Sequence, residues 1–95
     1  MSSLVQMVEK ELKIPKDRLI EEGVRYFLES ELRNLSLEIK KIVNQYGVDS
    51  FAELWEKLEA GKITESECFD NLSRLEYLEL EKEKVANLLQ KALSR

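Results

Sequence analysis

Residues 28–46, LESELRNLSLEIKKIVNQY, carry apolar side chains at spacings that alternate between four and three positions. This alternation is the pattern of a coiled-coil seam, a narrow apolar ridge along one face of an α-helix. The pattern begins just after Phe27, where the phase of the apolar positions slips by one residue. The ridge is formed by Leu28, Leu32, Leu35, Ile39, Ile42 and Tyr46.

The helix that carries this ridge is expected to run from Pro15 to Tyr46. Proline suits the first position of a helix and ends the one before it, and Gly47 supplies a C-terminal stop. A glycine inside a helix costs about 1 kcal/mol, so a break at Gly23 is an open alternative. The helix would be roughly 45 Å long, which is more than the width of a domain of this size. Part of the ridge therefore needs a cover, either the last helix of the same chain or a second copy.

Three further helices are predicted from a repeated N-terminal signature. A serine or threonine that is followed three residues later by glutamate or glutamine forms a capping box, which satisfies the free N–H groups at a helix start. The pairs are Ser3 with Gln6, Ser50 with Glu53 and Thr64 with Glu67. With 95 residues, one proline and three glycines, the chain is expected to be a single all-α domain over residues 1–95. We expect two long helices to form a helical hairpin, joined by short helices.

Two kinds of contact surface follow from this arrangement. The ridge predicts a homodimer, parallel or antiparallel, with Leu28, Leu32, Leu35, Ile39 and Ile42 as self-association residues. A second surface is predicted at three aromatic residues, Trp55, Phe69 and Tyr77, because such residues dominate interface hot spots. A tryptophan such as Trp55 more often pins a short helix to the core, and Tyr77 equally suits the edge of the core. Phe69 could also be internal core.

The residue types argue against catalysis. The chain has no histidine and one cysteine, so it lacks the usual general base, a zinc-type Cys/His set and an internal disulfide. Cys68 lies among apolar positions and is expected to pack as a small hydrophobe. We therefore expect a protein without enzymatic activity, metal or cofactor. No window is apolar enough for a membrane span, and a cytoplasmic location is expected.

The charge pattern bears on the partner. Residues 1–47 hold eight basic and eight acidic residues, whereas residues 48–95 hold seven basic and eleven acidic ones. An acidic second half fits a basic partner, although solvated helix faces explain the same counts. A helix-turn-helix at the Pro15 corner is an alternative that would make the chain a DNA-binding regulator. The basic residues there are interleaved with as many acidic ones, so nucleic acid is disfavoured as a partner but stays open.

Three stretches together suggest a family. They are IPKDRLIEEGVRYFLESELR at 14–33, YGVDSFAELWEKLEAGKITE at 46–65 and LSRLEYLELEKEKVANLL at 72–89. The chain resembles small archaeal and bacterial helical proteins that are similar to antitoxins of toxin-antitoxin pairs. The resemblance implies a protein that binds and neutralises a basic companion toxin, often a ribonuclease, encoded by an adjacent gene. Such antitoxins also repress their own operon, but the DNA-binding ribbon and disordered C-terminal tail of the better-known ones have no counterpart here. A helical scaffold or adaptor without a toxin is the remaining alternative.

Overall fold

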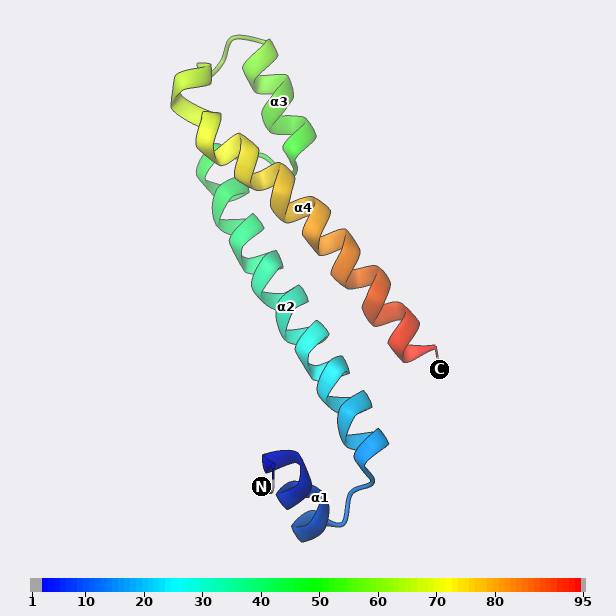
Figure 1. Cartoon of the computed structure of the whole chain (residues 1–95). Coiled ribbons are helices and arrows are strands. Elements are labelled where there is room, and N and C mark those ends of the chain that lie inside the picture. Colours follow the sequence, from blue (N-terminus) through cyan, green and yellow to red (C-terminus); the bar gives the residue numbers. More distant parts are fainter. Residues whose placement is uncertain (1–2, 95) are drawn as a thin grey trace.

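A computed structural model describes residues 3–94, which form four α-helices and no strand. The helices are α1 (Leu4–Leu12), α2 (Lys16–Tyr46), α3 (Phe51–Glu59) and α4 (Glu65–Leu93). The two long helices, α2 and α4, run antiparallel as a hairpin, and the short α3 packs beside them at the end where the chain turns (Figure 1). The short α1 lies at the opposite end of α2. The predicted all-α hairpin is therefore confirmed, in a molecule of 61 × 29 × 17 Å.

The corner between α1 and α2 is close to the one predicted. Ser3 and Gln6 form the expected capping box, in which the Ser3 hydroxyl accepts the Gln6 N–H at 3.2 Å. Helix α1 ends at Lys13, which has left-handed backbone angles, with φ at 56°. Pro15 takes an extended conformation, with ψ at 140°. Helix α2 therefore begins at Lys16, one residue later than expected.

Helix α2 is continuous through Gly23, so the break considered there does not occur. The helix ends at Gly47, whose φ of 65° is the left-handed conformation that glycine adopts without strain. The N–H of the next residue, Val48, donates to the Val43 carbonyl at 3.0 Å and satisfies one of the last free carbonyls. The predicted glycine stop is thus confirmed.

The starts of α3 and α4 differ in how they are capped. The Ser50 hydroxyl accepts the Glu53 N–H at 3.2 Å, as predicted, but the Glu53 carboxylate accepts the N–H of Asp49 in place of that of Ser50. Thr64 stands at the N-cap of α4 without a side-chain bond to the helix, because its hydroxyl pairs with the Ser66 hydroxyl at 3.3 Å. The predicted helix start is right there, and the predicted capping bond is wrong.

The hydrophobic core lies at the end of the hairpin that α3 covers, which we call the closed end. Leu54 of α3 and Leu75 of α4 are fully buried, and Ile42 of α2 packs in the same cluster. Cys68 is 1% exposed, so its predicted packing role is confirmed. Among residues 3–94, the buried side chains are Leu28, Ile42, Val43, Val48, Leu54, Cys68, Leu72, Leu75 and Leu78. All of these except Leu28 belong to the closed end.

Polar bonds between helices fix the closed end further. The Glu79 carboxylate of α4 accepts the N–H of Phe51 at 2.8 Å, and so caps α3 from another helix. Lys57 donates to the Tyr46 carbonyl at 2.7 Å, and Asn71 donates to the Tyr46 hydroxyl at the same distance. These bonds connect α2, α3 and α4 at the point where buried backbone groups most need partners.

Candidate interaction surfaces

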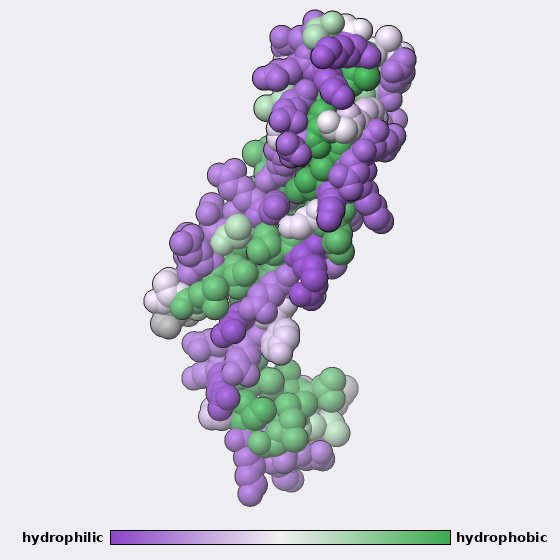
Figure 2. Space-filling model, turned by 180° about the vertical axis from the view of Figure 1, so that it is seen from behind, coloured by the Kyte–Doolittle hydropathy of each residue, from purple (hydrophilic) through white to green (hydrophobic). Residues whose placement is uncertain are grey.

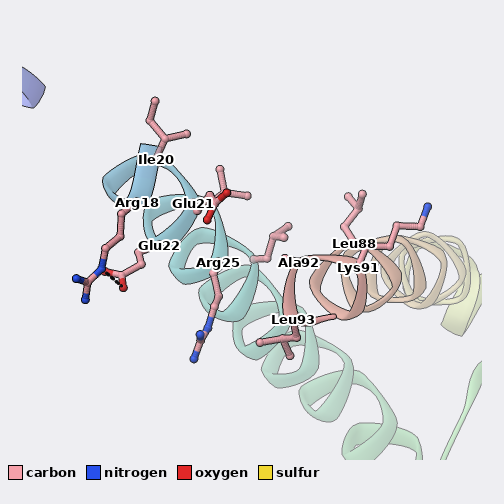
Figure 3. Close-up of a pocket in the computed structure, with 11 residues that line it drawn as sticks. Arg18, Ile20, Glu21, Glu22, Arg25, Leu88, Lys91, Ala92 and Leu93 are labelled. Carbon is pink, nitrogen blue, oxygen red and sulfur yellow. Dashed lines mark hydrogen bonds and ion pairs between the residues drawn. The ribbon is translucent and has the colours of Figure 1, made fainter. Parts of the chain in front are cut away.

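At the other end of the hairpin, the open end, a groove of about 760 Å³ lies between α2 and α4. Its apolar lining comes from Ile20, Val24 and Leu28 of α2 and from Leu88, Ala92 and Leu93 of α4. Ile20 and Leu88 point to the same side of the two helices (Figure 3). All of these side chains except Leu28 and Ala92 are about half exposed. The open-end groove is therefore an apolar surface that this chain does not cover.

Helix α1 presents a second apolar surface beside the groove. Among residues 3–94 it contacts α2 but neither α3 nor α4, and none of its residues is buried. Leu4, Val5, Met7 and Leu12 are all exposed. Figure 2 shows apolar surface over α1 and over the C-terminal end of α4 on the same side of the molecule. The open end thus combines an amphipathic helix and an apolar groove.

The charges around the groove are mostly neutralised within the chain. Arg18 pairs with Glu22 at 3.2 Å, and Arg25 pairs with Glu29 at 3.1 Å, each one helical turn apart on α2. Glu21 and Lys91 also line the groove, one on each helix. The rim is therefore of mixed sign and favours neither a strongly acidic nor a strongly basic partner.

Much of the predicted self-association ridge is covered by the chain itself. Ile42 is buried in the core, and Leu35 and Ile39 pack against that core. Leu32 is half-buried, while Leu28 is buried at the floor of the open-end groove. The sequence pattern predicts that the ridge packs against either the last helix of the same chain or a second copy. The structure shows it packed against α4 of the same chain. Self-association through these five residues stays a prediction.

The three predicted partner-binding residues are exposed. The exposed fractions are 45% for Trp55, 56% for Phe69 and 58% for Tyr77. The Trp55 ring stacks on Phe51 within α3, with centroids 6.2 Å apart. Phe69 and Tyr77 lie about two turns apart on α4. Phe69 points away from the core although its neighbour Cys68 is buried, because consecutive helical residues point about 100° apart.

Phe69 and Tyr77 belong to a larger patch, which we call the outer α4 surface. It consists of Phe69, Tyr77 and Leu80, which are exposed on α4 away from its buried residues, with the acidic residues Asp70 and Glu76 beside them. Leu80 is also exposed. Two basic residues of α4 already have carboxylate partners, since Arg74 pairs with Glu38 and Lys84 pairs with Glu81. The outer α4 surface is therefore aromatic and acidic.

The open-end surface was not predicted as a site. Its signal in the sequence is the set of apolar positions before the ridge, Ile20 and Val24, together with the strongly amphipathic stretch at residues 4–12. These positions could be recognised as one surface only once the hairpin brought α4 beside them. Within the part of the chain that the structure describes, three or more metal-ligating side chains do not gather anywhere. No described helix combines the length and the apolar character that a membrane span requires.

The fold and surfaces define an all-helical hairpin protein with exposed apolar surface at its open end and on the outer side of α4. The chain belongs to the family described as the Uncharacterized protein MJ0235 family, whose model matches residues 1–94. It is 34% identical over 73 residues to "Uncharacterized protein MJ0235" of Methanocaldococcus jannaschii, a match that covers 77% of this chain and 89% of that protein. No solved structure matches.

Of the predicted resemblance, these matches confirm an uncharacterised family with an archaeal relative. Neither the family's description nor the relative's name mentions a toxin, an antitoxin or an activity. The antitoxin relationship therefore stays a proposal, and it depends on the surfaces of this chain.

Proposed function

We propose that this protein is a protein-binding module that holds a partner on the outer α4 surface and, in its most specific form, acts as an antitoxin for a companion toxin. The observation that carries the proposal is the alignment of Phe69, Tyr77 and Leu80 on a helix face that the chain leaves uncovered. Exposed aromatic residues beside charged ones are typical of interface hot spots. A helix docked into a groove of the partner would use such a stripe.

The charges support a basic partner. Asp70 and Glu76 lie beside the aromatic residues, and the nearby Arg74 is paired with Glu38 of α2. Complementary charge speeds encounter and selects between partners more than it adds affinity. A basic ribonuclease toxin would satisfy this requirement, and so would any other basic protein, which is the adaptor alternative.

DNA binding at the Pro15 corner has less support. Arg18 and Arg25, which would contact phosphates, are each paired with a glutamate one turn away. Phosphate binding would have to break these pairs or act beside their negative charge. A regulator of this kind would shift its own promoter DNA with a steep dependence on salt, which gel-shift titration measures.

The test is co-expression with the product of the adjacent gene. If the proposal is right, the two proteins co-purify, and the neighbour harms growth when expressed alone but not with this chain. The double variant Phe69→Ser/Tyr77→Ser should raise the dissociation constant at least about tenfold, because it removes two aromatic anchors. The matched control is Leu37→Ser, at a leucine of α2 that is 54% exposed, and it should leave binding unchanged.

The outcomes separate the alternatives. A neighbour that binds without harming growth supports an adaptor instead of an antitoxin. A neighbour that neither binds nor harms cells contradicts the antitoxin proposal. If the neighbour binds the double variant as tightly as the original chain, the outer α4 surface is not the binding site.

A further inference from the structure

We propose that a second copy of this chain covers the open end, so that α1 of each copy lies in the open-end groove of the other. The dimer would have twofold symmetry, because each copy offers both the helix and the groove. Its contact residues, Ile20, Val24, Leu88 and Leu93 with the apolar face of α1, differ from the ridge residues that the sequence pattern indicates. The proposal is independent of any partner on the outer α4 surface.

The length of α1 fits the groove. The stretch of α2 from Ile20 to Leu28 that lines the groove is about 12 Å long, and the nine-residue α1 is about 13 Å long. Leu4, Val8 and Leu12 recur every four residues and therefore lie along one side of α1. A helix with this stripe can place its apolar side chains between α2 and α4.

Helix α1 also needs a cover for its own stability. Isolated helices shorter than about 12–15 residues are marginal in water, and most helical stability in proteins comes from packing of an apolar face. In this chain α1 has no buried residue and lies against α2 without reaching α4. Its capping box and its left-handed end at Lys13 define a helix whose apolar face still lacks a partner.

The position of the two surfaces favours a reciprocal contact. The apolar face of α1 and the apolar end of α4 lie on the same side of the molecule (Figure 2). Two copies that meet through this side with their long axes antiparallel would place each α1 over the groove of the other. Exchange of a terminal helix between identical chains is a common route to dimers.

The charges allow two identical chains to meet at this end. Residues 1–47 are neutral overall, whereas the excess of four acidic residues lies in 48–95. Contact through α1 and the first half of α2 joins the neutral parts and keeps the closed ends, with α3 and the acidic start of α4, apart. The groove carries both Lys91 and Glu21, and α1 carries both Glu9 and Lys10, so pairs of opposite charge are available to a second copy.

The apolar area is that of a small dimer interface. Eight exposed side chains contribute, namely Leu4, Val5, Met7, Leu12, Ile20, Val24, Leu88 and Leu93. Their exposed parts amount to about 400 Å² per copy, if a whole aliphatic side chain offers about 100 Å². Stable interfaces bury about 800 Å² per partner, of which about 65% is apolar in homodimers. The expected dimer is therefore near the lower end of the roughly 600–1,000 Å² per partner that stable interfaces bury, and it dissociates on dilution.

The test is sedimentation equilibrium of the full chain at protein concentrations from about 1 to 500 μM, a range over which mass action reveals a weak dimer. We expect the mass to rise from 11.1 kDa towards twice that value. The groove variant Val24→Glu/Leu88→Glu should raise the dissociation constant at least about tenfold, because it would bury carboxylates in an apolar site. The α1 variant Val5→Glu/Leu12→Glu should have the same effect.

The control is Leu37→Glu/Leu80→Glu, which places the same two charges at exposed leucines outside the groove and should leave the dimer intact. Circular dichroism should show an unchanged closed-end unfolding transition in every variant, because none of the altered residues is buried. A monomer at all concentrations would overturn the proposal. A dimer that resists the α1 variant or the groove variant would also overturn it.

Discussion

At the scale of single residues, stability is concentrated in a few side chains of the closed end. Leu54 and Leu75 are fully buried and come from two different helices. Tyr46 receives two side-chain bonds, one from Lys57 to its carbonyl and one from Asn71 to its hydroxyl. These contacts connect α2, α3 and α4. A substitution at one of them should therefore weaken the packing of all three helices.

Leu75→Ala should lower the free energy of unfolding by about 2–5 kcal/mol, the range for a leucine removed from a packed core. Leu37→Ala is the matched control, since its side chain is exposed and the loss should stay within about 0.5 kcal/mol. Urea unfolding followed by circular dichroism measures both values. Equal effects of the two changes would mean that the core does not lie where the structure places it.

Residue-level prediction from the sequence succeeded for Cys68 and left Phe69 open between an interface and the edge of the core. Both residues fit a loose helical stripe, but only one of two consecutive positions can face the core, and Cys68 takes it. The hydrogen bond from the Phe51 N–H to the Glu79 carboxylate joins residues 28 positions apart, so no local sequence pattern predicts it. The exposed state of Trp55 depends on how α3 sits against α4, which the sequence pattern of α3 does not determine.

At the scale of elements, the helices were predictable because their ends carry local signals. The capping box of Ser3 and Gln6, the bond from the Glu53 N–H to the Ser50 hydroxyl and the stop at Gly47 all act within a few residues, and the structure shows each of them. Thr64 is the exception, because a neighbouring hydroxyl at Ser66 competes for its side chain. Helix α4 still begins after Thr64 without this capping bond, because packing of its buried residues against α2 and α3 stabilises the helix.

The continuity of α2 at Gly23 leads to a prediction. Gly23→Ala should stabilise the chain by up to about 1 kcal/mol, because alanine is the better helix former and the added methyl meets no atom within 4 Å. Gly47→Ala should destabilise it by about 1–2 kcal/mol, because the left-handed conformation at φ 65° is strained for alanine. Thermal unfolding compares the two variants. A loss of stability in Gly23→Ala would contradict a regular helix at this position.

At the scale of the whole molecule, the hairpin divides into a closed end with a buried apolar core and an open end with exposed apolar surface. Among residues 3–94, ten of the fifteen exposed large apolar side chains lie in α1, in α2 before Leu28, or in α4 from Leu88 onward. The ridge of residues 28–46 predicted that a cover was needed. The sequence pattern could not distinguish a cover from the same chain from one supplied by a second copy, because both present the same apolar spacing.

The open end is where the sequence was least informative. Ile20 and Val24 continue the apolar spacing of α2 beyond the phase slip, but α4 ends opposite them and the helices leave a groove. The hydrophobic effect favours burial of this surface by any apolar partner and does not specify the partner. Its occupant therefore follows from the shape, length and charge of the surfaces in three dimensions.

In the proposed dimer, a second copy covers the open end, while the closed end is stable by itself. Hydrogen exchange measured at low and at high protein concentration is the most direct test of this arrangement. We expect the backbone amides of α1 and of the α2 and α4 segments that line the groove to exchange more slowly as the concentration rises. Amides of the closed end, around Ile42, Leu54 and Leu75, should exchange slowly at every concentration, because their opening requires global unfolding. Exchange in α1 that is independent of concentration would contradict a cover supplied by a second copy.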